Sequence, residues 1–171
     1  SDWDQIVIDG LAPIIDWYSI HLYTGQADHY TTVFQSHQAE RAIRICAALI
    51  ERARYTQRLT HPIHIAFDEW NVWYKARAGE HMAKPGWPVA PPLIEEIYDL
   101  QDALMVGGAL ITLLNNANRV KVACQAQLVN VIGLIFSEPG GPAWRQTIFH
   151  PFKIVTEHAH GSVLEVKVQS D

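Results

Sequence analysis

Residues 65–74 read IAFDEWNVWY, an apolar run that leads directly into two acids and two tryptophans. The apolar start predicts a buried strand, so the carboxylates stand where that strand ends. Tryptophan faces stack on the C–H faces of sugar rings, and a carboxylate can attack or stabilise an anomeric carbon. The stretch therefore predicts a strand end that holds a nucleophile against a sugar.

The composition is that of one globular domain with a neutral ligand. The chain has 171 residues, of which 49% are apolar and 18% charged, enough for a sizeable core. The net charge of −5 argues against nucleic acid or an anionic membrane as a partner, because both favour a basic surface. The longest apolar run is too short to span a bilayer, and the acidic start does not resemble a secretory signal. Cys46 and Cys124 are expected to be free, buried thiols.

The periodicity of apolar residues predicts helices that alternate with strands, which implies parallel βαβ units. The expected elements are helices at 3–15, 37–57 and 93–117 and strands at 16–23, 63–71 and 119–127. Three such units do not close a barrel, so the chain is expected to be part of something larger. Residues 76–92 predict a long functional loop. The alternating tail at 162–169 predicts a half-buried strand.

Polar side chains gather at the ends of all three predicted strands, where reactive groups lie in a β/α barrel. They are His21 and Tyr23, then Glu69, Asn71 and Trp73, then Gln125 and Gln127. On this argument His21 and Asn71 are candidate substrate contacts beside the acid. The alternative is a set of buried polar groups that the backbone satisfies, with Glu69 as a structural carboxylate.

Five segments, in order along the chain, resemble glycoside hydrolase family 51, the α-L-arabinofuranosidases. FDEWNVWY at 67–74 is similar to the family's nucleophile signature. The other four segments are SIHLY at 19–23, VAPPLIEEIYDLQDAL at 89–104, AQLVNVI at 126–132 and WRQTIFHPF at 144–152. His150 departs from the pattern, which has tyrosine there. The resemblance covers nearly the whole chain.

The resemblance implies an α/β fold, a (β/α)8 TIM barrel followed by a β-sandwich. Residues 1–152 would supply about the last three barrel strands, six to eight. Residues 153–171 would begin the sandwich with its first strand. The implied reaction is the removal, with retention, of terminal α-L-arabinofuranosyl residues from arabinose-containing oligosaccharides and polysaccharides.

The resemblance also implies a role for each site residue. Glu69 would be the nucleophile, and Tyr23 would hydrogen-bond it and orient it. Trp73 would wall the sugar pocket, and Gln127 would bind a sugar hydroxyl. The family's proton donor is the Glu of an Asn-Glu pair at the end of strand four, and this chain contains no such pair. Asp68 is expected on the opposite face from Glu69, because neighbours on a strand alternate.

The acid/base is therefore expected from outside these residues, and the chain alone is expected to be inactive. The expected partners are an arabinofuranoside oligosaccharide and an N-terminal barrel part, from the same gene product or a separate chain. No cofactor and no metal are expected, and the family resemblance implies a cytoplasmic homo-oligomer such as a hexamer. Two alternatives stay open, another barrel glycosidase such as a xylosidase or endoglucanase, and a non-catalytic barrel fragment that acts as scaffold. Exposed, unpaired edges on the first and third strands would favour the scaffold.

Overall fold

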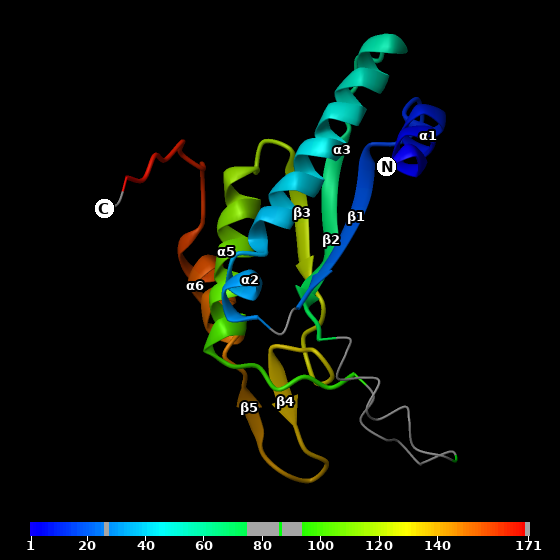
Figure 1. The fold of residues 1–171 in the computed structure, drawn as a ribbon. Helices are drawn as coiled ribbons and strands as arrows, with labels where there is room; N and C mark the ends of the chain where they lie inside the picture. Colours follow the sequence, from blue (N-terminus) through cyan, green and yellow to red (C-terminus); the bar gives the residue numbers. More distant parts are fainter. Residues whose placement is uncertain (26–27, 75–85, 87–93, 170–171) are drawn as a thin grey trace.

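A three-stranded parallel sheet in the order β1-β2-β3 forms the centre of the chain (Figure 1). The computed structural model describes residues 1–25, 28–74, 86 and 94–169, so most of the predicted loop at 76–92 lies outside the described residues. The strands are β1 (Trp17–Thr24), β2 (His64–Val72) and β3 (Val120–Gln125). All three predicted strands are confirmed, with ends that agree within two residues.

Helices connect and cover the strands. They are α1 (Asp2–Leu11), α2 (His29–Val33), α3 (Ser36–Thr56), α5 (Leu100–Asn115) and α6 (Phe149–His158). The prediction of α3 is confirmed, whereas α2 and α6 were not predicted. Helix α5 begins seven residues later than predicted, because the Asp99 carboxylate caps the backbone N–H groups of Gln101 and Asp102.

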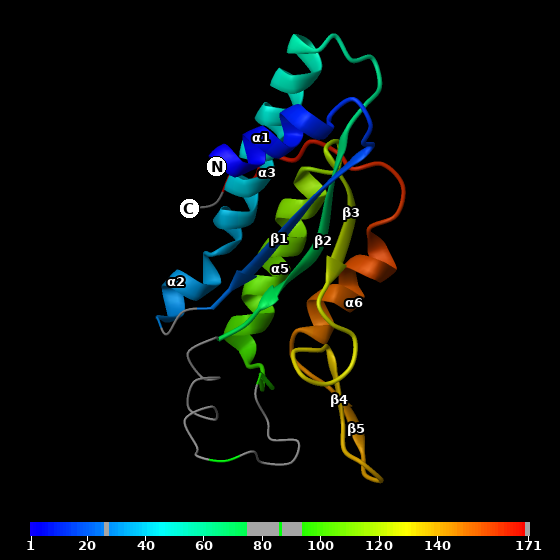
Figure 2. The same ribbon diagram turned by 90° about the vertical axis from the view of Figure 1, so that its right-hand side faces the viewer.

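The sheet is covered on one face. Along β1, Tyr18 is buried against the helices, while Ser19 and His21 on the opposite face are exposed. Helices α3 and α5 pack against each other and against β2, and Figure 2 shows them running beside the sheet. Among the described residues β1 and β3 are the edges of this sheet. The open face therefore carries His21, one of the polar side chains that the sequence placed in the site.

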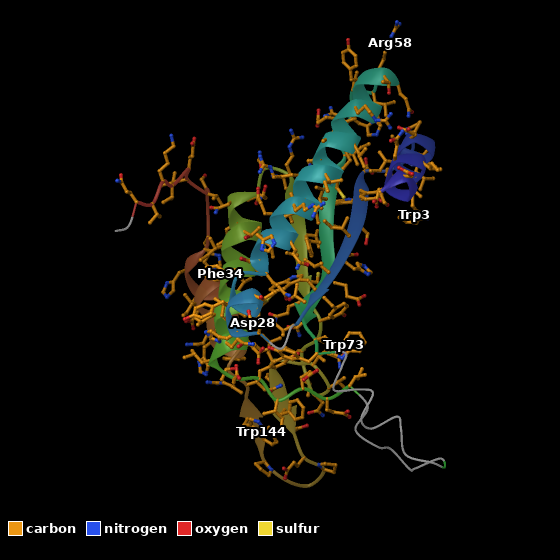
Figure 3. All side chains as sticks on the ribbon, in the orientation of Figure 1. Trp3, Asp28, Phe34, Arg58, Trp73 and Trp144 are labelled. Carbon is orange, nitrogen blue, oxygen red and sulfur yellow. The ribbon has the colours of Figure 1, made fainter. Side chains whose placement is uncertain are left out.

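A small antiparallel hairpin lies beyond the carboxyl ends of the strands. It consists of β4 (Ile135–Ser137) and β5 (Ala143–Arg145), joined by a turn at 138–142. Phe136 and Trp144 pack on one another across it, with ring centroids 5.6 Å apart. Figure 3 shows Trp144 at the same end of the molecule as Trp73, which follows β2.

Two predictions are corrected. Residues 162–169 are exposed and belong to no strand, because alternation alone makes no sheet without a partner to take the backbone hydrogen bonds. Cys46 is buried as expected, but Cys124 is exposed, since it lies on the edge strand β3.

Helix α6 contains both residues 152 and 153, between which the domain boundary is expected. That boundary stays a prediction. None of the helices in the described ranges combines the length and the hydropathy of a bilayer span.

Candidate active site

The carboxylate of Glu69 lies near the carboxyl end of β2 and accepts a hydrogen bond from Tyr23 on β1. The phenol oxygen of Tyr23 lies 2.5 Å from Oε1 of Glu69. The parallel pairing of β1 with β2 makes this contact, because it sets Tyr23 beside Asn71 and His21 beside Glu69. Burial, and then the hydrogen bond to Glu69, raises the pKa of Tyr23 above its ordinary value. The phenol therefore keeps its proton at neutral pH and holds one carboxylate oxygen in place.

Trp73 lies directly after β2 and packs its indole edge-on against the ring of Tyr23, with centroids 5.4 Å apart at 75°. Its backbone N–H donates to the carbonyl of Thr24 at 2.6 Å. A Cβ atom added to Gly25 would lie 2.8 Å from the carbonyl oxygen of Trp73, so this approach needs a glycine. The ends of β1 and β2 are thus joined where the indole packs on Tyr23, the residue that donates to Glu69.

His21 connects both acids of the strand end. Its Nδ1 lies 3.4 Å from Oε2 of Glu69, and its Nε2 lies 3.4 Å from Oδ1 of Asp68. The same Asp68 oxygen accepts a hydrogen bond from the Ser19 hydroxyl at 2.7 Å. The imidazole and both carboxylates are each 40–50% exposed, so this face of the site is open.

The position of Asp68 corrects the expectation that neighbouring acids face opposite ways. Two steps along β1 here correspond to three along β2, so β2 carries one extra residue, a β-bulge. A bulge re-aims side chains, and both Asp68 and Glu69 reach His21 as a result. The sequence did not predict that Asp68 and Ser19 would lie beside His21 and Glu69. For Ser19 the strand periodicity could have predicted it, because Ser19 stands two residues before His21 and so shares its face.

Asn71 is placed differently from its predicted role. It is 1% exposed, and its Nδ2 donates to the carbonyls of Ala126 and Ile132. Its Oδ1 accepts from the N–H of Val72 at 2.8 Å and from the Gln125 amide at 3.0 Å. Both donor hydrogens and both acceptor positions are occupied within the chain. No hydrogen-bonding position of the Asn71 amide is left for a substrate. Its role here is structural, to hold together the backbone around the site.

Gln127 lies in the exposed loop that follows β3. Its side-chain Nε2 contacts the carbonyl of Asn130 at 3.4 Å, within the same loop. The backbone N–H of Ala126, the preceding residue, donates to the carbonyl of Trp70 at 3.0 Å. The loop is thus tied to β2 one residue after Glu69. The structure brings Tyr23 and His21 to Glu69 and packs Trp73 on Tyr23, and it sets Gln127 in the loop that follows β3.

Apolar grooves follow both edges of the sheet. One of about 670 Å³ runs along β1 between α1 and α3 and is lined by Trp3, Trp17 and Ile45. Another of about 220 Å³ lies between β3 and the helices α5 and α6. Open strand edges with apolar flanks are suited to receive further strand and helix units.

Comparison with known proteins identifies the family. A family model described as "Alpha-L-arabinofuranosidase C-terminal domain" matches residues 68–171. The "Intracellular exo-alpha-(1->5)-L-arabinofuranosidase" of Halalkalibacterium halodurans is 42% identical over 172 aligned residues, which cover 99% of this chain. The structure of AbfB of Bifidobacterium longum, described as a family 51 alpha-L-arabinofuranosidase, covers 94% of the chain with a TM-score of 0.84 and 34% identity. The chain belongs to glycoside hydrolase family 51.

Other family 51 comparisons agree. The "Intracellular exo-alpha-(1->5)-L-arabinofuranosidase 1" of Bacillus subtilis is 38% identical over 99% of this chain. The arabinose complex of the Thermotoga maritima alpha-L-arabinofuranosidase covers 92% of the chain with a TM-score of 0.73 and 31% identity. The chain spans only about a third of the length of these relatives. It covers 34% of the H. halodurans protein, 34% of the B. subtilis protein and 29% of the T. maritima chain. It corresponds to their C-terminal part by the family model.

Proposed function

We propose that this family 51 chain supplies the nucleophile part of a retaining α-L-arabinofuranosidase, with Glu69 as the nucleophile. The observation that carries the proposal is the 2.5 Å hydrogen bond from Tyr23 to Glu69 at a strand's carboxyl end. A nucleophile must be charged and fixed in direction, and a neutral phenol donor serves both needs without adding charge. The indole of Trp73 beside it offers an apolar wall for the ring of a sugar.

The reaction proceeds in two displacements. An oxygen of Glu69 attacks the anomeric carbon of the terminal arabinofuranose while the bond to the leaving oxygen breaks. That oxygen takes a proton from a second carboxyl group, roughly 5–5.5 Å from the first in retaining enzymes. Water, deprotonated by the same second group, then cleaves the glycosyl ester and frees Glu69. Retention follows from the two successive inversions.

The second carboxyl group is assigned to residues outside this chain. Asp68 is the acid nearest in sequence to Glu69, but one of its carboxylate oxygens accepts a hydrogen bond from Ser19 and lies 3.4 Å from Nε2 of His21. These neighbours favour the ionised carboxylate and not a proton donor. The relatives are about three times as long as this chain, and the grooves along β1 and β3 are apolar. We assign both grooves to the remaining strands and helices of a (β/α)8 barrel, which would bring the proton donor to the open face.

The other proposals follow the same reasoning. We assign residues 1–152 to the barrel and residues 153–171 to the start of the sandwich. The relatives named intracellular support action inside the cell, and association into an oligomer such as a hexamer stays a prediction.

A scaffold role is the second candidate, because β1 and β3 end the sheet with unpaired edges among the described residues. Open edges also follow directly if further barrel strands pair there. Specificity for xylosides or glucans on the same barrel is a third candidate. The relatives named arabinofuranosidases support arabinose over both sugars.

The test uses the complete enzyme, in which this segment is joined to the rest of the barrel. Glu69→Ala is expected to abolish hydrolysis of an aryl α-L-arabinofuranoside, and added azide is expected to restore turnover as a glycosyl azide of inverted configuration. Azide fits the space of the lost carboxylate and attacks in its place. Intact hydrolysis by Glu69→Ala would remove the nucleophile assignment. Equal or faster hydrolysis of xylosides by the unmodified enzyme would instead favour the alternative glycosidase.

A further inference from the structure

The side chain of Asn71 is a buried connection between the strand that carries Glu69 and the loop that carries Gln127. It stands two residues after Glu69, is 1% exposed, and uses its amide hydrogens entirely on two backbone carbonyls. Neither carbonyl belongs to its own strand. An amide that is fully bonded in this way holds separate backbone segments at a fixed spacing.

The two carbonyls lie on the two limbs of one loop. Ala126, whose carbonyl accepts from Asn71, directly precedes Gln127, and Ile132 stands near the loop's end. The N–H of Ala126 also bonds β2, through the carbonyl of Trp70. Both polar groups of the Ala126 backbone are therefore fixed by the two residues that follow Glu69. The direction in which Gln127 leaves β3 is set by β2 and not by β3 alone.

The loop between these limbs is strained and needs such support. Asn130 and Val131 adopt φ angles of 59° and 57°, in the left-handed region. A β-branched residue such as Val131 is unfavourable there and persists only where its surroundings impose it. The Asn71 bond to Ile132 fixes the carbonyl next to Val131 along the chain. Other bonds also hold the loop, from the N–H of Glu96 to the carbonyl of Val131 and from the N–H of Leu134 to the carbonyl of Gln127. Loss of the Asn71 bond would therefore shift the limb that carries Gln127 without releasing the whole loop.

We propose that Asn71 is a positioning residue that sets the place of Gln127 relative to Glu69. The proposal rests on the proposed function, in which Glu69 meets the anomeric carbon and Gln127 a hydroxyl of the same sugar. Two groups that bind one small ring act together only when their spacing matches it, and misplacement by about 1 Å can cost about 100-fold in rate. Gln125 supports this role, because its amide donates to Oδ1 of Asn71 and so orients Nδ2 of Asn71 toward the carbonyls of Ala126 and Ile132.

A double-mutant cycle in the complete enzyme tests the proposal, with kcat/KM for an aryl α-L-arabinofuranoside as the readout. Asn71→Ala and Gln127→Ala are each expected to lower kcat/KM by about 10- to 100-fold, the range seen when supporting residues of a site are removed. In the Asn71→Ala background, Gln127→Ala is expected to cost less than about 3-fold more. A residue that only stabilises the fold would give losses that multiply, because independent sites add in free energy. Multiplying losses, or an unchanged kcat/KM in Asn71→Ala, would overturn the proposal.

Asn116→Ala is the matched control. Asn116 also donates two side-chain hydrogen bonds, to Glu40 and to the carbonyl of Thr112, but it stands after α5 at the opposite end of the sheet. It is expected to lower the melting temperature while leaving kcat/KM and the effect of Gln127→Ala unchanged. Should Asn71→Ala fail to fold, Gln125→Ala is run through the same cycle and is expected to show the same non-additivity with a smaller loss.

The outcomes separate this inference from the proposed function. An unmodified enzyme without activity on arabinofuranosides, or one whose activity survives Glu69→Ala, would refute the function itself. A Gln127→Ala variant with full activity would overturn the positioning role of Asn71 and leave the function standing on Glu69.

Discussion

Removing the phenol of Tyr23 is the sharpest perturbation that the site allows. Tyr23→Phe deletes one oxygen and with it the 2.5 Å hydrogen bond to Oε1 of Glu69. Hydrogen bonds to charged groups contribute about 1.5–3 kcal/mol, and the 43% exposure of the carboxylate reduces this to about 1–2 kcal/mol because water replaces part of the bond. If the bond holds the nucleophile in its reactive direction, this loss corresponds to a kcat about 5- to 30-fold lower.

Tyr18→Phe, on the same strand β1, is the matched control. Tyr18 lies on the same strand with its hydroxyl 2.8 Å from the carboxylate of Asp4, but on the helix-covered face. Tyr18→Phe therefore removes the same kind of bond away from the site. It is expected to lower stability by about 1 kcal/mol and to leave kcat unchanged.

The assay compares hydrolysis of an aryl α-L-arabinofuranoside with thermal unfolding followed by circular dichroism, for both variants in the complete enzyme. The raised pKa of Tyr23 keeps its phenol protonated, so the loss from Tyr23→Phe is expected to be the same from neutral to mildly alkaline pH. An unchanged kcat in Tyr23→Phe, or an equal fall in both variants, would show that the bond to Glu69 has no part in turnover.

Three further predictions test the framework. Gly25→Ala is expected to destabilise the fold by about 1–3 kcal/mol in urea titrations, since its Cβ would meet the Trp73 carbonyl. Gly10→Ala, whose Cβ would lie in open space on α1, is expected to stabilise the fold by about 0.5–1 kcal/mol. Equal effects of the two substitutions would contradict the packing at Gly25. The hydrogen bond from Arg119 lowers the pKa of Glu51, so this carboxyl stabilises the fold above its ordinary pKa and loses that contribution as pH falls through the lowered value. Because the pair is half-exposed, Glu51→Gln should cost under about 1 kcal/mol at pH 7 and nothing near pH 2, and a cost independent of pH would refute the linkage. Intact-mass measurement of active protein from its natural source is expected to find a chain longer than 171 residues or a co-purifying partner, and activity in the 171-residue chain alone would contradict the proposal.

Local patterns in the sequence were enough for the regular elements. The apolar run before Asp68 predicted β2, and the stripe of apolar residues at helical spacing predicted α3, because side-chain periodicity reports directly which face of an element is buried. The predicted start of helix α5, residue 93, was wrong. Apolar residues at helical spacing continue before Asp99, but the Asp99 side chain caps the helix and sets its start at Leu100. The tail at 162–169 shows the opposite error, because a strand pattern describes a face and does not supply the neighbour that a strand requires.

The sequence alone predicted that Glu69 stands near the end of a buried strand and that Tyr23 and Trp73 accompany it, and its motifs already resembled family 51. Only the tertiary structure decided that Asp68 turns to the same side as Glu69, and that Asn71 joins β2 to the Gln127 loop instead of facing a ligand. The reason is physical. Burial periodicity is a property of neighbours along the chain. A bulge or a buried amide depends on partners more than forty residues away in sequence, as the pairing of His21 with Glu69 and the Asn71 bonds to Ala126 and Ile132 illustrate.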